Sequence, residues 1–320
     1  MLTDILILGL AIAVQTFPAQ APAVDASDRP FKLIATAELV LLDVSVKDAA
    51  GEHISNLSKE NFRVYEDGKL QKITQFGSGD VPVTVGLVID TSRSMRSKYP
   101  DVMTAAMAFS QASNQKDEVF VVNFGDRVTS GLPDDVPFTS DVNQLRKALS
   151  WEVPAGRTAL YDAIMFSLDH LEKGKCERRA LLLVSDGGDN SSTHNSEEVA
   201  RMVRESRATI YTIGVFDEND EDRNPGLLQR LARVSGGDAF FPEQLSKVIG
   251  ICRQIASDIR TRYTIGYVPV RSGERGSLRK IKVTASTPSG HNLVVRTRTS
   301  YFLPDRRSLA YGEASRKPGL

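Results

Sequence analysis

The chain has 320 residues, and its 40 Lys and Arg side chains are balanced by 40 Asp and Glu side chains. A chain of this length can bury a large core and form more than one domain. The zero net charge gives no support to a nucleic-acid partner, which a strongly basic chain would favour. Function therefore has to be inferred from the order of residues along the chain.

The first residues are similar to a secretory leader. Residues 5–14 are apolar or small, too few for a membrane span of roughly 20 residues, and Ala19 and Ala21 form a small-x-small cleavage site. We predict a signal peptide over residues 1–21, export to the periplasm or the medium, and no transmembrane span in the mature chain. Asp4 and the lack of an early Lys or Arg leave open an upstream start codon, or an amino terminus that is disordered or docked on the core.

Cys176 and Cys252 are the two cysteines. In an exported protein they can form one disulfide. Both also lie beside helical patterns, where a free thiol is often buried as a small apolar side chain, so the sequence leaves both states open. No lipid-attachment cysteine stands directly after the leader, and we therefore expect no lipid anchor.

Two segments have the period of two that is typical of β-strands. A linker over residues 22–30 leads to the first, residues 31–78, where Leu42, Val44 and Val46 alternate with polar residues and Glu66-Asp67-Gly68 predicts a turn. The second covers residues 259–304 and precedes a polar tail, residues 305–320, that we predict to be disordered. Each segment is small for an independent domain, so we predict that the two join in one β sandwich.

The basic residues of the second segment include Lys280, Lys282, Arg296 and Arg298. No aromatic residues interleave with them as they would in a surface that binds single-stranded nucleic acid. We interpret them as the solvated face of a sheet.

Residues 80–258 alternate between apolar strands and amphipathic helices, which predicts an α/β domain with a doubly wound, mostly parallel sheet. Its opening strand is the apolar run from Val83 to Ile89, which suits a strand covered on both faces. The predicted architecture is therefore an α/β domain inserted between two β segments, with its two ends side by side.

Polar residues follow two of the predicted strands at the same edge of this sheet. Asp90, Ser92 and Ser94 come directly after the opening strand, Thr158 lies in a loop before a helix, and Asp186 follows the buried strand Ala180 to Ser185. Parallel strands present their carboxyl ends on one side, so we expect these groups to meet. Oxygen ligands alone suit a hard cation such as Mg²⁺.

This pattern resembles the von Willebrand factor type A domain and its metal-ion-dependent adhesion site, which is written Asp-x-Ser-x-Ser followed by a Thr and an Asp. Two further stretches match the sequence motifs of this family: residues 156–163, Gly-Arg-Thr-Ala-Leu-Tyr-Asp-Ala, and residues 184–187, Val-Ser-Asp-Gly. The resemblance covers about residues 80–255. The β segments at either end are similar to those of a bacterial group of exported proteins with this domain.

The resemblance implies a bound Mg²⁺ or Mn²⁺ ion. Ser92, Ser94 and Thr158 would bind it directly, whereas Asp90 and Asp186 would act mainly through water. Such an ion stays electron-poor and keeps an open position for an Asp or Glu carboxylate of a protein partner.

Three residues beside this set are candidate ligand contacts: Arg93, Arg157 and Gly187. Arg157 stands where many members of the family have Gly, and two interpretations are open. Its charge either repels the ion or points outward and helps to hold an incoming carboxylate. Arg93 likewise either reaches the ligand or faces solvent.

Other polar residues near these loops are not predicted ligands. Asp162 is interpreted as a first-turn helix residue, Asp189 as a tie within its own loop, and His194 as a surface residue. The acidic run over residues 217–222 lacks the Gly and the spaced Glu of an EF-hand, so we interpret it as a solvated loop.

We therefore expect an exported, divalent-metal-dependent protein-binding module and not an enzyme, because the motifs Gly-x-Ser-x-Gly, His-Glu-x-x-His and Gly-x-x-x-x-Gly-Lys are absent from the sequence. Two alternatives remain open. One is a metal-assisted hydrolase, and the other is a structural domain with a vestigial metal site.

Overall fold

The computed structural model describes residues 39–112, 114–149, 153–216, 223–269 and 276–303, which belong to one unit, Glu38–Leu320. The predicted signal peptide, linker and tail lie outside these residues, as does the acidic run 217–222. Within the described ranges, no helix has the length and apolar character needed to cross a membrane.

The centre of the unit is a six-stranded sheet in the order β10-β9-β8-β5-β6-β7. Only β7 runs antiparallel to its neighbour, so the sheet is mostly parallel, as predicted. Every residue of β5 is buried, which confirms that its continuous apolar run is covered on both faces. The strands are β5 Val83–Asp90, β6 Glu118–Phe124, β7 Val128–Ser130, β8 Arg178–Ser185, β9 Thr209–Gly214 and β10 Ala239–Phe240.

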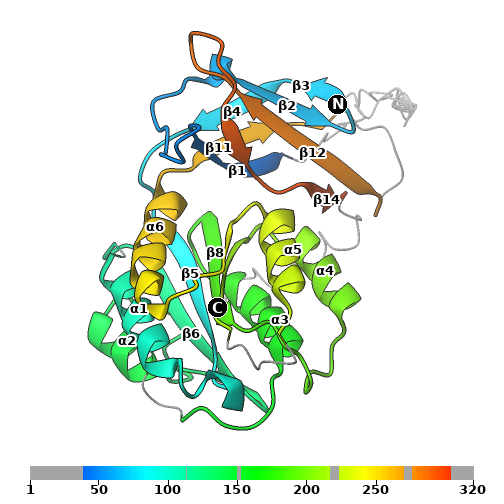
Figure 1. Ribbon diagram of the computed structural model, residues 1–320. Coiled ribbons are helices and arrows are strands. Elements are labelled where there is room, and N and C mark those ends of the chain that lie inside the picture. Colours follow the sequence, from blue (N-terminus) through cyan, green and yellow to red (C-terminus); the bar gives the residue numbers. More distant parts are fainter. Residues whose placement is uncertain (1–38, 113, 150–152, 217–222, 270–275, 304–320) are drawn as a thin grey trace, which may run out of the picture. The chain divides into compact units, whose positions relative to one another are not determined.

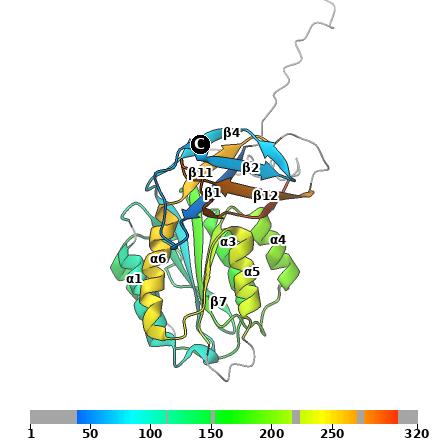
Figure 2. The same ribbon diagram turned by 45° about the horizontal axis from the view of Figure 1, so that its top comes forward.

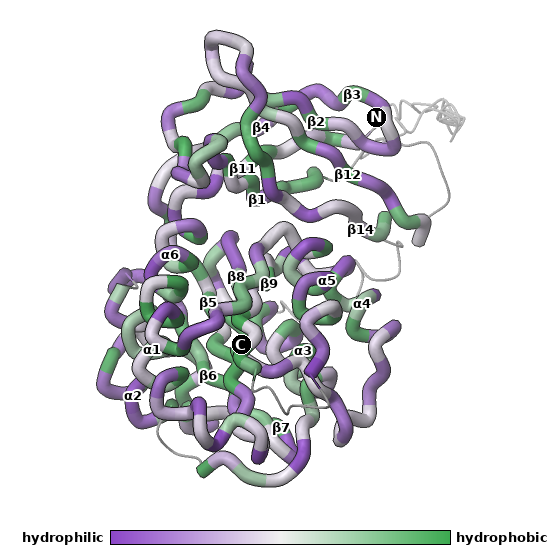
Figure 3. The backbone as a smooth tube through the Cα atoms, in the orientation of Figure 1, coloured by the Kyte–Doolittle hydropathy of each residue, from purple (hydrophilic) through white to green (hydrophobic). Residues whose placement is uncertain are grey.

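Helices cover both faces of this sheet, as in a doubly wound fold (Figure 1). α1, α2 and α6 lie on one face and α3, α4 and α5 on the other, and the tilted view agrees for the labelled helices (Figure 2). Figure 3 shows the hydrophobic colouring concentrated on the strands between these layers. The helices are α1 Tyr99–Ala112, α2 Val142–Leu149, α3 Leu160–Leu171, α4 Ser196–Glu205, α5 Pro225–Ser235 and α6 Val248–Arg260.

The helix caps agree only in part with the sequence. Asn195, a residue type favoured at this position, caps α4 by accepting hydrogen bonds from the N–H groups of Glu197 and Glu198. At the start of α2, where Ser140 is also a residue of a capping type, the Asp141 carboxylate accepts a hydrogen bond from the Asn143 N–H at 2.7 Å. Neighbouring short polar residues can each cap a helix, and the sequence alone does not show which of them does so.

The two β segments join in two four-stranded sheets, with the orders β13-β1-β11-β4 and β14-β12-β2-β3. Each sheet mixes strands from both ends of the chain: β1 pairs with β11, and β2 with β12. Their buried apolar residues form a single cluster, which confirms the predicted sandwich. The strands are β1 Val40–Lys47, β2 Phe62–Glu66, β3 Lys69–Gln71, β4 Ile73–Gly77, β11 Tyr263–Tyr267, β12 Leu278–Ala285, β13 Val294–Arg296 and β14 Ser300–Phe302.

The predicted turn after Glu66 is present. Asp67 and Gly68 have φ of 47° and 80°, the left-handed backbone that a two-residue hairpin between β2 and β3 requires. Glu66 itself is buried, and one of its carboxylate oxygens accepts hydrogen bonds from the hydroxyls of Tyr267 at 2.7 Å and Tyr301 at 2.8 Å.

The polar residues of β1 contact the α/β domain. Ser45 is 2% exposed, and its hydroxyl donates to Asp258 in α6 at 2.5 Å. Lys47 is paired with Asp238, which follows α5, at 3.3 Å. Alternation along β1 therefore separates an apolar core face from a polar face that is also buried.

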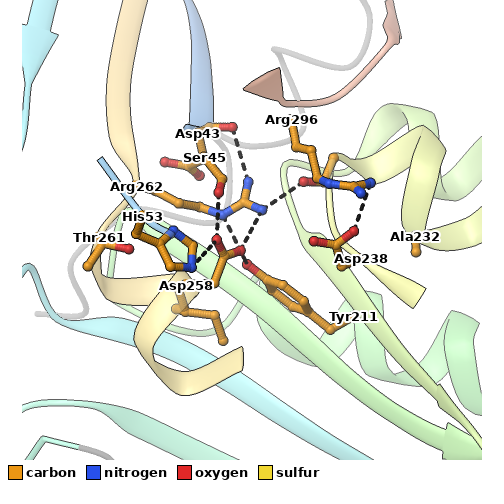
Figure 4. Close-up of polar contacts among 12 residues, drawn as sticks. Asp43, Ser45, His53, Tyr211, Ala232, Asp238, Asp258, Thr261, Arg262 and Arg296 are labelled. Carbon is orange, nitrogen blue, oxygen red and sulfur yellow. Dashed lines mark hydrogen bonds and ion pairs between the residues drawn. The ribbon is translucent and has the colours of Figure 1, made fainter. Parts of the chain in front are cut away.

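Arg262, between α6 and β11, lies at the centre of this contact (Figure 4). It is 1% exposed, and its guanidinium donates to the Tyr211 hydroxyl, to the backbone carbonyls of Asp43 and Gly236, and to the Asp258 carboxylate. A buried guanidinium is tolerated because nearly all its donors have acceptors and one of them is charged.

Asp258 is the counter-charge of Arg262. Burial by itself would raise the pKa of the Asp258 carboxyl, but the charge of Arg262 and the hydroxyls of Ser45 and Tyr211 outweigh it and lower the pKa to about 2. A lowered carboxyl pKa means that the ionised form stabilises the folded chain.

The prediction that the basic residues of the second β segment are solvated is correct for Lys280, Lys282 and Arg296, which are exposed, and wrong for Arg298. Arg296 is paired with Asp238 at 2.7 Å. Arg298 is half-buried and donates to the backbone carbonyls of Ser300 and Arg204. Both contact the α/β domain, a partner that the alternation in sequence does not reveal.

The two cysteines are free thiols; Cys252 is buried in α6 and Cys176 is half-buried before β8. Burial alone raises the pKa of Cys252 to about 12. Of the two states that the sequence leaves open, the structure has the unpaired one.

We expect Asp258→Asn to lower the free energy of unfolding by about 3–5 kcal/mol, because it leaves the Arg262 guanidinium buried without a counter-charge. The control Asp169→Asn, at a carboxylate whose side chain is 75% exposed, should change stability by less than about 0.5 kcal/mol. Urea unfolding of the two variants and the native chain measures this. Equal losses in both variants would contradict the role given to Asp258.

The lowered pKa of the Asp258 carboxyl also predicts that the stability of the fold depends on pH in the acid range. The folded-state pKa of about 2 lies below the ordinary 3.8, so its stabilisation is complete above pH ~4 and is lost as the pH falls towards 2, a total of about 2 kcal/mol. The Asp258→Asn variant should not lose this part of its free energy of unfolding when the pH falls. Urea unfolding at neutral and acid pH measures the loss in the variant and in the native chain. A variant that loses stability with acid as steeply as the native chain would refute the assignment.

Candidate metal-ion site

The site is built where β5 and β8 end side by side. These strands are paired in parallel up to Ile89 and Val184, so Asp90 and Asp186 follow at the same edge of the sheet. Both carboxylates are buried, at 0% and 3% exposure. The position is the topological switch point of the sheet, because the chain continues from β5 to β6 on one side and to β8 on the other.

Two hydroxyls complete a chain of oxygens with Asp186. The Ser92 and Ser94 hydroxyl oxygens are 3.0 Å apart, and the Ser94 hydroxyl donates to an Asp186 carboxylate oxygen at 2.5 Å. A short 3₁₀ helix, Arg93–Met95, brings both serines to the same side of the turn. The structure thus brings Ser92, Ser94 and Asp186 into direct contact, as the sequence pattern predicts.

Asp90 lies behind these oxygens. One of its carboxylate oxygens accepts from the Ser92 backbone N–H at 2.9 Å and the other from the Ser185 hydroxyl at 2.6 Å. Burial, and then the charge of Asp186, raise the pKa of Asp90 to about 7. Two buried carboxylates thus stand near each other, and the partners of Asp90 in the described part of the chain are neutral hydrogen-bond donors.

Thr158 reaches this edge on a loop that is bonded to the loop after β5. The Ala155 N–H donates to the Thr91 carbonyl at 2.9 Å, and the Arg93 N–H donates to the Gly156 carbonyl at 3.2 Å. Thr158 is 5% exposed, and its hydroxyl has no hydrogen bond to another residue in the described ranges. The structure therefore brings it to the site through its backbone, with its oxygen unused.

Arg157 is held by a neighbour that the sequence analysis did not identify. The Asp126 carboxylate accepts the Arg157 backbone N–H at 2.8 Å and lies 3.7 Å from its Nε, and a guanidinium N–H donates to the Asn190 carbonyl at 3.3 Å. The side chain is 68% exposed. Its charge is thus balanced by Asp126 in solvent, which favours the interpretation in which Arg157 points outward.

The other two candidate ligand contacts differ in exposure. Arg93 is exposed between the two serines. Gly187 is buried, and its N–H donates to the Ser185 hydroxyl at 2.9 Å. Their contact with a ligand stays a prediction.

The polar residues that were not predicted as ligands hold the loop after β8 against α3. Asp162 accepts from the N–H groups of Thr193 and His194 and lies 2.7 Å from His194 Nδ1. Asp189 accepts from the Ser192 hydroxyl at 2.5 Å and from the Tyr161 N–H at 3.1 Å. Asp189 therefore ties its loop to α3 as well as to itself.

The residues at this edge fit a hard divalent ion. Among the residues that the structure describes, no cluster of three or more His, Cys, Asp or Glu side chains could bind a metal. The candidate set instead has two carboxylates and three hydroxyls, all of them oxygen donors. The uncompensated charge of the carboxylates and the unused Thr158 hydroxyl are what such an ion would satisfy.

The sequence profile of the von Willebrand factor type A domain matches residues 84–254, which is more than half of the chain. The chain belongs to this family. Type A domains mediate protein interactions. No curated protein matches the chain in sequence.

Several solved structures are similar to this chain. A von Willebrand factor type A protein from Catenulispora acidiphila is 12% identical, with 85% of this chain and 75% of that chain covered and a TM-score of 0.51. Proximal thread matrix protein 1 from the mussel byssus is 16% identical (61% and 51% covered, TM-score 0.49). The corresponding domain of a type V pili tip protein from Porphyromonas gingivalis is 14% identical (61% and 98% covered, TM-score 0.44). The likeness to the Catenulispora acidiphila protein, at 12% identity, shows the fold alone.

We expect Gly187→Ala to lower the free energy of unfolding by about 1–3 kcal/mol. Gly187 has φ of 84°, and an added Cβ would lie 2.6 Å from the carbonyl oxygen of Asn224. Gly250→Ala is the control, because an added Cβ there meets nothing within 4 Å in helix α6 and should stabilise by up to ~1 kcal/mol. Thermal and urea unfolding measure both changes, and equal stability of the two variants would show that the turn after β8 is not constrained as described.

Proposed function

We propose that the protein is an exported protein-binding module that recognises an acidic residue of its partner through a divalent ion, Mg²⁺ or Mn²⁺. Family membership supports the protein-interaction role. The export part of the proposal rests on the leader-like sequence of residues 1–21.

The observation that carries the metal part is the contact of Ser92, Ser94 and Asp186 beside Asp90. Neutral hydroxyls would bind the ion directly, and the carboxylates would orient them. A bound Mg²⁺ or Mn²⁺ would supply a positive centre that attracts the carboxylate of a partner. Because few negative ligands surround it, that centre would keep its affinity for one more carboxylate.

The rim of the site supports an acidic partner. Arg93 is exposed between the two serines, and Arg157 is exposed beside the Thr158 loop. Asp126 and the Asn190 carbonyl hold Arg157 in place, so less side-chain entropy is lost when its guanidinium binds a carboxylate. Long-range attraction between these cations and an acidic partner would also speed association.

The hydrolase alternative has weaker support. A metal-assisted hydrolase needs a general base within hydrogen-bond reach of the reacting water. In the described ranges no His is hydrogen-bonded to Asp90, Ser92, Ser94, Thr158 or Asp186, and His194 is engaged with Asp162. The vestigial alternative requires that Arg157 replace the ion, whereas its guanidinium is paired with Asp126.

Calorimetric titration of the metal-stripped chain with Mg²⁺ and Mn²⁺ tests the metal part. We expect one saturable site, with affinity reduced at least about tenfold in Ser94→Ala and lost in Asp90→Ala, because both remove oxygens from the set. Asp101→Asn, an exposed carboxylate in α1, is the matched control and should bind as the native chain does. No binding by the folded native chain, or unchanged binding by Asp90→Ala, would refute the site.

Arg157→Ala distinguishes the two interpretations of that residue. Because Asp126 already balances its charge in solvent, the substitution should change the metal dissociation constant by less than about threefold. The same titration measures it. A tenfold gain in metal affinity would mean that Arg157 repels the ion, and would favour the vestigial interpretation for the native chain.

A further inference from the structure

A cavity lies at the edge of the central sheet opposite the candidate metal site. It has a volume of about 950 Å³ and is lined by residues at the starts of β5, β6, β8 and β9 and by residues of β1, β4 and β11. Cavities of this size commonly hold small molecules. Neither the family match nor the proposed function assigns it a role.

The lining of this cavity is rich in positive charge. Five cationic side chains contribute to it: Lys116, Lys175, Arg178, Arg207 and Arg298. Three acidic side chains oppose them: Asp43, Glu118 and Glu177. The cavity therefore carries an excess of two positive charges and favours an anion.

The two positive charges in excess in the cavity lining are those of Arg207 and Arg298. Asp43 lies 3.5 Å from Arg178 Nε and balances that guanidinium. Lys116, Lys175, Glu118 and Glu177 are close in sequence at the starts of β6 and β8 and balance one another in number. Arg207 and Arg298 are left, and neither is paired with a carboxylate in the part of the chain that the structure describes.

Arg298 has N–H groups that donate to no residue in the described part of the chain. Its Nε donates to the Ser300 carbonyl and its Nη2 to the Arg204 carbonyl, and the guanidinium lies over the Tyr301 ring at 5.9 Å. Its Nη1 has no hydrogen bond to a described residue, which leaves two N–H groups unused. Planar N–H donors of this kind bind carboxylate and phosphate oxygens well.

Arg207 and Arg298 line the same cavity. Burial, and then the charge of Arg207, lower the pKa of Arg298 to about 10, so the Arg298 guanidinium stays a cation at neutral pH. Two adjacent like charges beside a cavity, one of them half-buried, disfavour the empty state. An anion placed between them would remove that cost and would fill the unused donors.

We propose that this cavity binds a small organic anion through Arg207 and Arg298, with a carboxylate or phosphate group against the two guanidinium groups. Leu41 and Phe76 offer apolar surface to the remainder of the ligand. The cavity is thus a second binding site, separate from the metal edge.

Citrate and pyrophosphate are the probes, and they distinguish carboxylate from phosphate recognition. Binding of each to the full chain, stripped of metal and dialysed free of chelator, is measured by calorimetry in metal-free buffer at physiological ionic strength. The metal site then does not contribute, and a failure of the proposed metal site would not affect the result. We expect saturable binding of one molecule of at least one probe per chain. The tighter probe identifies the preferred group.

Arg207→Gln is the decisive variant, because Arg207 is exposed and makes no hydrogen bond to a described residue that folding would lose. We expect it to weaken binding of the preferred probe at least about tenfold, and Arg298→Gln to do the same if thermal unfolding shows that it is folded. Arg253→Gln, an exposed arginine of α6 with the same change in charge, should bind as the native chain does. Absence of saturable binding to the folded native chain, or equal affinities in Arg207→Gln and Arg253→Gln, would overturn the proposal.

Discussion

The common direction of the parallel strands is the constraint on which this structure depends. Because β5, β8 and β9 run the same way, their carboxyl ends collect the polar loops at one edge, and Asp90 and Asp186 meet there although they are far apart in sequence. Because of the same strand direction, the chain enters β5 and leaves α6 at the opposite edge of the sheet, where the parallel strands begin. Arg178, at the start of β8, donates to the carbonyls of Ile259 and Arg260 there. The β sandwich is therefore joined to the domain at the edge that does not carry the candidate site.

The junction with the sandwich is held by charge as much as by apolar packing. Arg262 is a fully buried guanidinium between α6 and β11, and Asp258, four residues earlier, is its counter-ion. Ser45 of β1 and Tyr211 of β9 both donate to Asp258, so one carboxylate connects the sandwich, the central sheet and the last helix (Figure 4). Such a cluster is costly to assemble, and it specifies how these elements meet because each donor requires its own acceptor.

Much of the fold could be predicted from the sequence, because each element has a local pattern. The buried run of β5, the alternation along β1 and the cap at Asn195 follow from residue types and spacing alone. The candidate site was also predictable, since parallel strands dictate where Asp90 and Asp186 go. The partners of Arg157, Arg262 and Arg298 could not be predicted: Asp126 is 31 residues away from Arg157, and Tyr211 is 51 away from Arg262. A polar side chain on a strand looks the same in sequence whether it faces water or another domain.

The proposed function depends on the binding of a divalent ion by the oxygens at the carboxyl edge of the sheet. The most direct test is the anomalous diffraction of crystals soaked in Mn²⁺. We expect one strong peak within about 2–2.5 Å of the Ser92 and Ser94 hydroxyl oxygens, where the structure brings these oxygens together beside Asp186. Manganese peaks only at other positions, or no peak at this edge in crystals that hold the folded chain, would contradict it.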